Sequence, residues 1–151
     1  MINFPKTLIP TKDEMDSARK FADEMNGKLN SYEGTYRGEL SELCLGRMMG
    51  ESHKIEHNDE KKTKEYFWDL KIDGQLVDIK TSTGGYFTVS DYILNNATKN
   101  ILYPCYRAST KRFTLIGVLD GQQIQKLASP SKFYNGYFVS TNDIKLNDKG
   151  N

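Results

Sequence analysis

The chain has 151 residues, a length that suits one domain able to bury its own core. Hydrophobic residues make up 37% and aromatic residues 11%, which is typical of a globular protein and excludes a disordered chain. The formal net charge is only +1, so any contact with nucleic acid must come from a local patch. We therefore expect a single globular domain over residues 1–151.

The cysteines and the N-terminus bear on the cellular compartment. Cys44 and Cys105 are far apart and form no CxxC pair, which disfavours a disulfide scaffold or a zinc ribbon and predicts two reduced core thiols. The N-terminus lacks a basic region followed by an apolar run, and no apolar stretch approaches the ~20 residues that span a bilayer. The sequence predicts a cytoplasmic protein with no membrane partner.

The first half of the chain is predicted to be mainly helical. Residues 1–10 are expected to be irregular. Thr11 and Glu14 form a capping-box pattern that begins a helix ending near Met25, and a second helix is expected over 36–49. Residues 51–65 are almost all polar or charged and predict a solvated loop.

The second half is predicted to be rich in strands. Residues 66–72 and 75–81 form two strand patterns separated by Asp73-Gly74, a strong signal for a two-residue hairpin turn. The remaining expectations are a short helix at 91–99, a short helix or a turn at 121–128, and strands at 86–90, 101–107, 113–119 and 133–139. This order predicts a mixed α/β or α+β domain.

The hairpin turn fixes which side chains meet. If Asp73 and Gly74 alone form the loop, Asp69 lies opposite Asp78, with Cβ atoms about 4.5–5.5 Å apart. Lys80 lies two residues further along and shares their face. The apolar side chains expected on the opposite, core face are Trp68, Leu70, Ile72, Val77 and Ile79. A three-residue loop would change the register and separate the two acids.

Two opposed aspartates repel each other, and a divalent cation would remove that repulsion. Carboxylate oxygens suit Mg²⁺ or Mn²⁺, which lowers the pKa of bound water and stabilises charge on a phosphate. A nearby lysine can orient the water or support the developing charge. Asp69, Asp78 and Lys80 therefore indicate phosphodiester hydrolysis, and the alternative is an exposed hairpin carrying ordinary charges.

Residues 68–82, WDLKIDGQLVDIKTS, resemble the core of the PD-(D/E)XK nuclease superfamily, with Asp78-Ile79-Lys80 in the place of its acid-x-lysine element. Asp78 stands where glutamate is more frequent in that family. Family members usually carry a glutamate on the preceding helix, and here Glu42 matches it best, with Glu39 as the alternative. The resemblance implies an α/β restriction-endonuclease-like fold, a central mixed β-sheet flanked by helices. Its core would cover about 36–140, after an N-terminal helical extension over 1–35.

The same resemblance implies a Mg²⁺-dependent DNA endonuclease, with Mn²⁺ as a possible substitute. Asp69, Asp78 and Glu42 would bind the metal, and Lys80 would position the attacking water. The biological role stays open among mobile-element or homing, junction-resolving, restriction, and phage or repair nucleases. Cutting both strands would require a homodimer or a higher homo-oligomer. The alternatives are an inactive DNA-binding protein of the same fold and a small structural or interaction protein.

Further residues are candidates for weaker roles. Lys61, Lys62 and Lys64 precede the first acidic strand and could contact DNA phosphates, as could Ser82 after the lysine and Lys111-Arg112 in an expected hairpin turn. His53 and His57 have the i, i+4 spacing of a metal pair if they are helical, but their charged surroundings favour a solvated loop.

Overall fold

The computed structural model describes residues 2–25, 31–59, 67–97, 100–132 and 136–144. The described helices are α1 (Lys12–Met25), α2 (Tyr32–Met49), α3 (Asp91–Asn95) and α4 (Gly121–Leu127), with a 3-10 turn at Thr141–Asp143. The described strands are β1 (Thr7–Leu8), β2 (Ile55–His57), β3 (Leu70–Ile72), β4 (Gln75–Val77), β5 (Lys80–Ser82), β6 (Tyr86–Val89), β7 (Ile101–Ala108), β8 (Phe113–Asp120), β9 (Ser129–Pro130) and β10 (Tyr137–Ser140).

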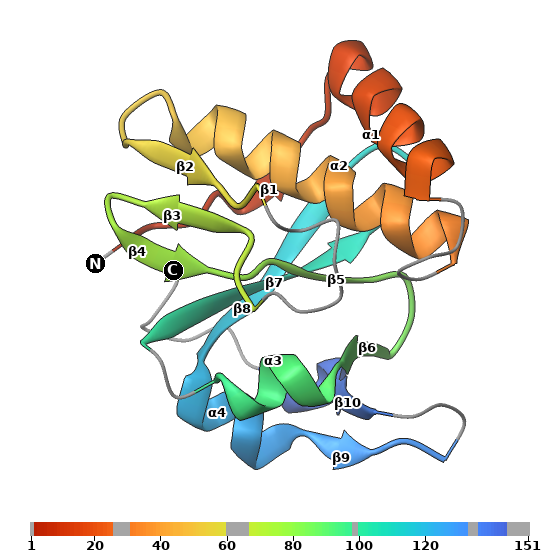
Figure 1. Cartoon of the computed structure of the whole chain (residues 1–151), viewed down its shortest axis with the longest axis vertical. Coiled ribbons are helices and arrows are strands. Elements are labelled where there is room, and N and C mark those ends of the chain that lie inside the picture. The colour runs from red at the N-terminus through yellow and green to blue at the C-terminus, as the bar shows by residue number, and fades with distance from the viewer. Residues whose placement is uncertain (1, 26–30, 60–66, 98–99, 133–135, 145–151) are drawn as a thin grey trace.

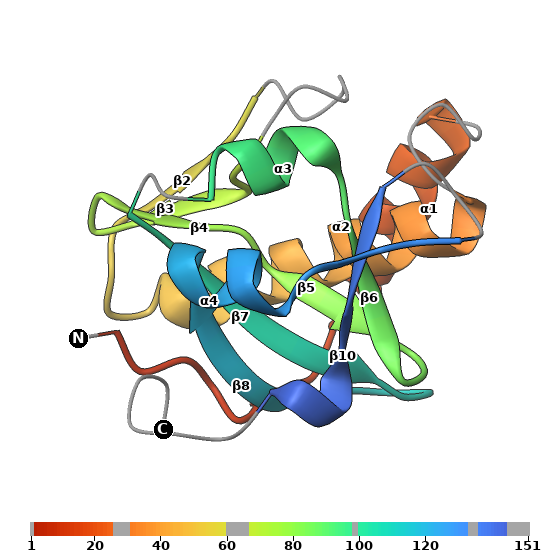
Figure 2. The ribbon, with the colours of Figure 1, turned by 90° about the horizontal axis from the view of Figure 1, so that it is seen from below.

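The strands form a curled mixed sheet between two layers. Within the described residues, seven strands make one sheet in the order β1-β8-β7-β4-β3-β2, with β5 also paired to β7. The helices α1 and α2 cover one side of it (Figure 1). On the other side lie α3, α4 and the small sheet β6-β10-β9 (Figure 2). The prediction of a mixed sheet flanked by helices is therefore confirmed at this level.

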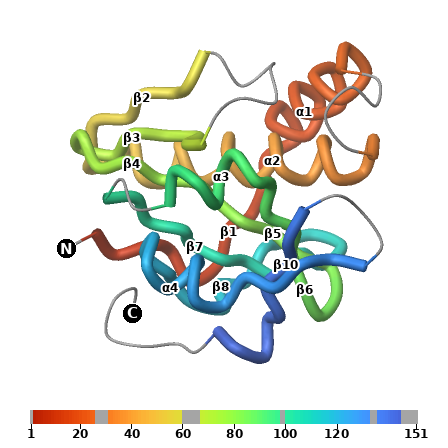
Figure 3. The backbone as a smooth tube through the Cα atoms, turned by 60° about the horizontal axis from the view of Figure 1, so that its bottom comes forward, coloured from red at the N-terminus to blue at the C-terminus, as the bar shows by residue number. Residues whose placement is uncertain are grey.

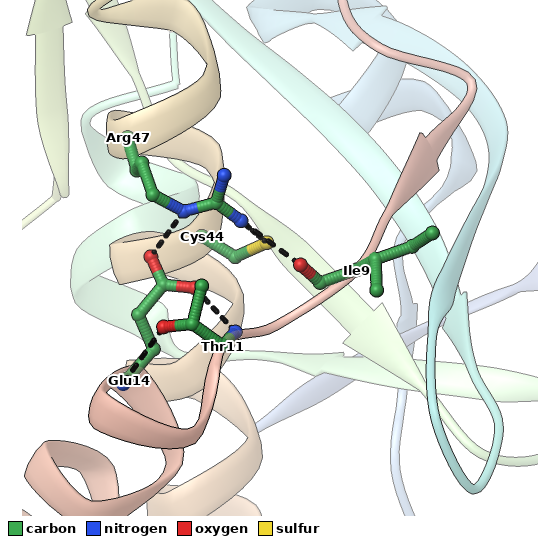
Figure 4. A network of polar contacts seen from close by, with 5 residues as sticks. All are labelled: Ile9, Thr11, Glu14, Cys44 and Arg47. Carbon is green, nitrogen blue, oxygen red and sulfur yellow. Dashed lines mark hydrogen bonds and ion pairs between the residues drawn. The ribbon is translucent and has the colours of Figure 1, made fainter.

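The predicted capping box starts α1 and also ties this helix to α2. The Thr11 amide donates to Glu14 Oε1 at 2.9 Å, and the Glu14 amide donates to Thr11 Oγ1 at 3.1 Å. Arg47 of α2 pairs with Glu14 at 2.9 Å and donates to the carbonyl of Ile9 at 2.9 Å (Figure 4). A single guanidinium thus fixes the start of α1 against α2.

Three predictions in the first half are wrong in detail. The second helix begins at Tyr32 rather than Tyr36, because the Ser31 hydroxyl accepts from the Gly34 amide and caps it there. Residues 7–8 are not irregular, since they pair with β8. The expected loop 51–65 contains strand β2, which pairs with β3 although two of its three side chains, Glu56 and His57, are polar. Residues 60–65 of that loop lie outside the described residues.

The Asp-Gly hairpin has the predicted two-residue turn. Asp73 and Gly74 both have positive φ, 50° and 82°, as a tight primed turn requires. The register pairs Ile72 with Gln75 and Leu70 with Val77, as predicted. The ladder ends at that last pair, so Asp69 and Asp78 lie just beyond it rather than within it.

The second hairpin strand is interrupted but does not change register. β4 and β5 both run parallel to β7, and the β7 partner is 25 positions later in both cases, Val77 with Leu102 and Lys80 with Cys105. The chain continues from β4 into β5 along the same neighbour (Figure 3). Only Asp78 and Ile79 separate them, and the Asp78 amide still donates to the Leu102 carbonyl at 2.9 Å.

The sheet carries a separate core on each face. Towards α2, the predicted core residues Leu70, Ile72, Val77 and Ile79 are buried in one cluster. Trp68 was expected with them, but it packs against the other cluster. Its alternation with Leu70 fails because residues 67–69 precede β3 and are not in a strand.

The rest of the chain follows the predicted order of elements. The two long strands β7 and β8 form a hairpin, with Lys111 and Arg112 in its turn. The final strand is β10, and residues 133–135 of the predicted strand lie outside the described residues. Cys44 and Cys105 are free and buried, as expected. None of the described helices combines the length and apolar character needed to cross a bilayer.

Candidate active site

Asp69 lies at the entrance to β3 and is held by the neighbouring strand. Its Oδ2 accepts a hydrogen bond from the Ile79 amide at 2.9 Å, and its own amide donates to the Val77 carbonyl at 2.8 Å. The residue is 8% exposed. Burial, and then the charges of Asp78 and Glu42, raise the pKa of Asp69 well above its usual value, while Lys80 opposes the shift.

Asp78 and Lys80 form an ion pair at the break between β4 and β5. Lys80 Nζ lies 2.9 Å from Asp78 Oδ2, and both side chains are largely buried. Burial alone would lower the pKa of Lys80, but the carboxylates of Asp78 and Asp69 outweigh it and the pKa is raised. Apart from this ion pair, Asp78 Oδ2 has no hydrogen-bond partner among the described residues.

Glu42 reaches the same place from α2. It is 2% exposed and its charge helps to raise the pKa of Asp69, whereas Glu39 is only half-buried. Both glutamates line the hollow that contains the aspartates. Between the two candidates, burial and electrostatic contact favour Glu42.

His57 was not assigned to the site, yet it contacts Glu42. Its Nδ1 lies 3.1 Å from Glu42 Oε2. A Cβ added at Gly46, one helical turn after Glu42, would lie only 3.1 Å from the His57 ring. The imidazole therefore packs against the bare backbone of α2 at Gly46. A strand in a charged segment carries no clear periodic signal, which is why the sequence did not indicate this contact.

The two histidines do not form the metal pair considered from their spacing. His53 precedes β2 and contacts Asp73 of the hairpin turn, with Nδ1 2.5 Å from Oδ2. This contact, and then the hydrogen bond from the Lys54 amide, lower the pKa of Asp73. His57 lies in β2 and contacts Glu42, so the helical alternative is wrong.

The candidate residues line one hollow, which we call the acidic cleft. It has a volume of about 420 Å³ and lies between α2 and the segment from β6 to α3. Its acidic end contains Glu42, Asp69, Asp78 and Lys80. Three carboxylates and one ammonium sum to −2 if all four are ionised, a charge that is costly in a buried site without a counterion.

The donor set of the acidic cleft suits a hard cation. Carboxylate oxygens are the preferred ligands of Mg²⁺ and Mn²⁺, and Asp69 with its raised pKa would ionise more readily beside a cation. The described residues contain no group of three acids, histidines or cysteines already arranged around one metal position. Binding would therefore require side-chain rearrangement, including a change in the contact between Asp78 and Lys80.

The weaker DNA-contact candidates have different outcomes. Ser82 is 2% exposed, and its hydroxyl donates to the Tyr86 carbonyl at 2.5 Å and accepts from the Gly84 amide at 3.1 Å. It stabilises a turn, so the prediction that it contacts DNA is wrong. Lys111 and Arg112 are exposed in the β7–β8 turn. Lys61, Lys62 and Lys64 lie outside the described residues.

Tyr103 of β7 is a further polar group near the acids. It is fully buried, and its hydroxyl has no hydrogen-bond partner within the described ranges. Burial, and then the charge of Asp78, raise the pKa of Tyr103. A tyrosine in a strand-like apolar run gives no sign in the sequence that its hydroxyl will be left near a carboxylate.

Comparison of the chain with protein-family models, with curated proteins and with solved structures found no match.

Proposed function

We propose that this protein is a Mg²⁺-dependent DNA endonuclease with a restriction-endonuclease-like fold. The observation that carries the proposal is the convergence of Glu42, Asp69, Asp78 and Lys80 in one cleft, from α2, from the start of β3 and from the β4–β5 break. The resemblance of residues 68–82 to the PD-(D/E)XK nucleases adds the reaction class. DNA is the substrate that this resemblance implies, and an acidic cleft with a lysine suits phosphodiester hydrolysis once a metal ion is bound.

The residues would have separate roles. Asp69, Asp78 and Glu42 would hold the metal ion, and Mn²⁺ could replace Mg²⁺. When bound, the ion lowers the pKa of a water ligand and stabilises charge on the phosphate. Lys80 would leave Asp78 to orient the attacking water and to support charge on the phosphate oxygens. The Ile79 amide would keep the Asp69 carboxylate in place throughout.

One acidic cleft would cut one strand in each event. Cleavage of both strands would need two copies of the chain, for which a symmetric homodimer is the simplest arrangement. The ratio of nicked to linear plasmid at increasing protein concentration tests this expectation. The role among homing, junction-resolving, restriction, and phage or repair nucleases would follow from cleavage of linear, branched and single-stranded DNA.

A second candidate is a DNA-binding protein of the same fold that does not cut. The observation that favours it is the ion pair of Lys80 with Asp78, which occupies the lysine that catalysis would need. Supercoiled plasmid incubated with Mg²⁺, with Mn²⁺ or with EDTA separates the candidates. Nicking with metal alone supports the endonuclease, whereas salt-sensitive binding without nicking supports the second candidate.

A further inference from the structure

Arg37 of α2 lies at the junction of two hollows. It lines the acidic cleft, and it also lines a second hollow of about 760 Å³, which we call the hairpin hollow. The hairpin hollow lies between α2 and the β7–β8 turn, and Figure 1 shows that turn passing behind α2. Among the described residues, Arg37 alone lines both hollows, so a ligand extending from one hollow to the other would pass it.

The guanidinium of Arg37 has unused donors. It is half-buried, and its Nε donates to Thr81 Oγ1 at 3.3 Å. Among the ion pairs formed by the described residues, none includes Arg37. Burial lowers the pKa of Arg37, and Glu33 opposes this shift. A guanidinium has five N–H donors in a fork that matches a phosphate, so this side chain can still bind an anion.

One continuous chain segment, residues 80–83, runs from the acidic cleft to the hairpin hollow. Lys80 and Thr81 line the acidic cleft, and Thr83 lines the hairpin hollow. Three residues of extended chain cover about 10 Å, which is the rise of roughly three nucleotides of one DNA strand. A short stretch of backbone could therefore contact both hollows.

The charges that line the hairpin hollow indicate that an anionic ligand belongs here. Of the described residues that line the hairpin hollow, three are cationic, Arg37, Lys111 and Arg112, and one is acidic, Glu33. Its lining is therefore net positive, opposite to the acidic end of the cleft.

We propose that the DNA backbone leaves the acidic cleft across Arg37 and enters the hairpin hollow. Arg37 binds the phosphate next to the scissile one, and Lys111 and Arg112 bind phosphates further along the same strand. The position of the scissile phosphate rests on the proposed function, but the binding path does not require cleavage. A cation-rimmed hollow joined to the cleft through a guanidinium that forms no ion pair with the described residues fits a polyanion better than an apolar peptide.

The test measures binding separately from cutting. The affinity of a labelled DNA duplex is measured in EDTA over a range of salt for the wild type, Arg37→Gln, Arg37→Lys and the double variant Lys111→Gln/Arg112→Gln. Lys126→Gln is the control, because Lys126 is an exposed cation on α4, at the other end of β8 from the hairpin turn. Thermal unfolding checks that each variant is folded.

Arg37→Gln is expected to weaken binding roughly tenfold and to make the slope of log K against log salt shallower by about 0.9. Arg37→Lys should keep the slope and recover part of the affinity, since it retains charge without the fork. The double variant should reduce the slope further, and Lys126→Gln should match the wild type.

The path is overturned if folded Arg37→Gln and the double variant bind as the wild type does, or if the wild type shows no salt-sensitive DNA binding. Failure of the proposed function looks different. In that case the wild type would bind DNA through Arg37 but cut none of it with Mg²⁺ or Mn²⁺. Conversely, the wild type could cut DNA with metal while Arg37→Gln binds DNA as tightly as the wild type. That result would contradict the proposed binding path but support the proposed nuclease activity.

Discussion

The Ile79 amide donates a hydrogen bond to Asp69 Oδ2 at 2.9 Å, so the backbone of the second acidic segment holds the carboxylate of the first. Asp78, the residue before Ile79, therefore lies near Asp69, and after burial its charge is the largest cause of the raised pKa of Asp69. The β3–β4 ladder ends at Leu70 and Val77, so the Ile79 amide bonds the Asp69 carboxylate instead of a backbone carbonyl. The backbone hydrogen bond thus keeps the two carboxylates close together, where they repel each other when both are ionised.

This repulsion predicts that substitution of the two aspartates by asparagine will change the free energy of unfolding in opposite directions. A raised folded-state pKa means that Asp69 contributes stability below its unfolded pKa and loses it as the pH rises through the folded pKa. Metal-free Asp69→Asn should therefore be about 0.5–2 kcal/mol more stable than the wild type at neutral pH, without that decline. Asp78→Asn removes the partner of buried Lys80 and should cost about 1–3 kcal/mol. Urea unfolding from pH 4 to 8 measures both, and a less stable Asp69→Asn would contradict the prediction.

The hairpin turn should be sensitive to substitution at Gly74. Its φ of 82° is left-handed, and an added Cβ would meet nothing within 4 Å, so the cost is purely conformational. Gly74→Ala should lower the free energy of unfolding by about 1–2 kcal/mol. Gly85→Ala is the matched control, because Gly85 also has open space but no positive φ. Equal effects on the two variants in chemical denaturation would argue against this reason.

Two glycines of α2 should respond differently to alanine. Gly38 has nothing within 4 Å of an added Cβ, so Gly38→Ala should stabilise the helix by about 0.5–1 kcal/mol. At Gly46 the same Cβ would press on the His57 ring at 3.1 Å, so Gly46→Ala should gain less or lose stability. Thermal unfolding compares the two directly. A larger gain at Gly46 would show that the imidazole does not rest against the helix there.

The two buried tyrosines of β7 form a second matched pair. The Tyr103 hydroxyl has no partner in the described residues, whereas the Tyr106 hydroxyl donates to the Pro5 carbonyl at 2.7 Å. Tyr103→Phe should be neutral or stabilising by about 1 kcal/mol, since it removes a buried unsatisfied group. Tyr106→Phe should destabilise by about 1 kcal/mol. We expect the unfolding midpoint of Tyr103→Phe to lie above that of Tyr106→Phe, and the reverse order would contradict the prediction.

The sequence predicted the features of the fold that depend on residues close together in the chain. The Asp-Gly turn and the alternation of Leu70, Ile72, Val77 and Ile79 gave the hairpin register, because both depend on neighbouring residues. The meeting of Asp69 and Asp78 followed from that register. The sequence did not predict that these two residues lie just beyond the β3–β4 ladder, since this depends on how β7 pairs with both β4 and β5.

The contacts that sequence patterns missed all join distant segments. His57 reaches Glu42 because β2 pairs at the sheet edge, and Arg37 reaches Thr81 because α2 crosses β5. Neither pairing has a local signal. For Ser82 the sequence instead suggested a contact that the structure does not support. Its polar side chain suggested contact with DNA, but its hydroxyl bonds the Tyr86 carbonyl in a turn inside the protein.

The most direct test of the active site is the rate at which supercoiled plasmid is nicked in Mg²⁺ by the wild type, Asp69→Asn and Lys80→Met. Asp143→Asn and Lys126→Met serve as controls, because they alter an exposed aspartate and an exposed lysine outside the acidic cleft. We predict that the wild type and both controls nick at the same rate, that EDTA stops them, and that both site variants are folded but inactive. Nicking by folded Asp69→Asn or Lys80→Met at the wild-type rate would contradict the assignment.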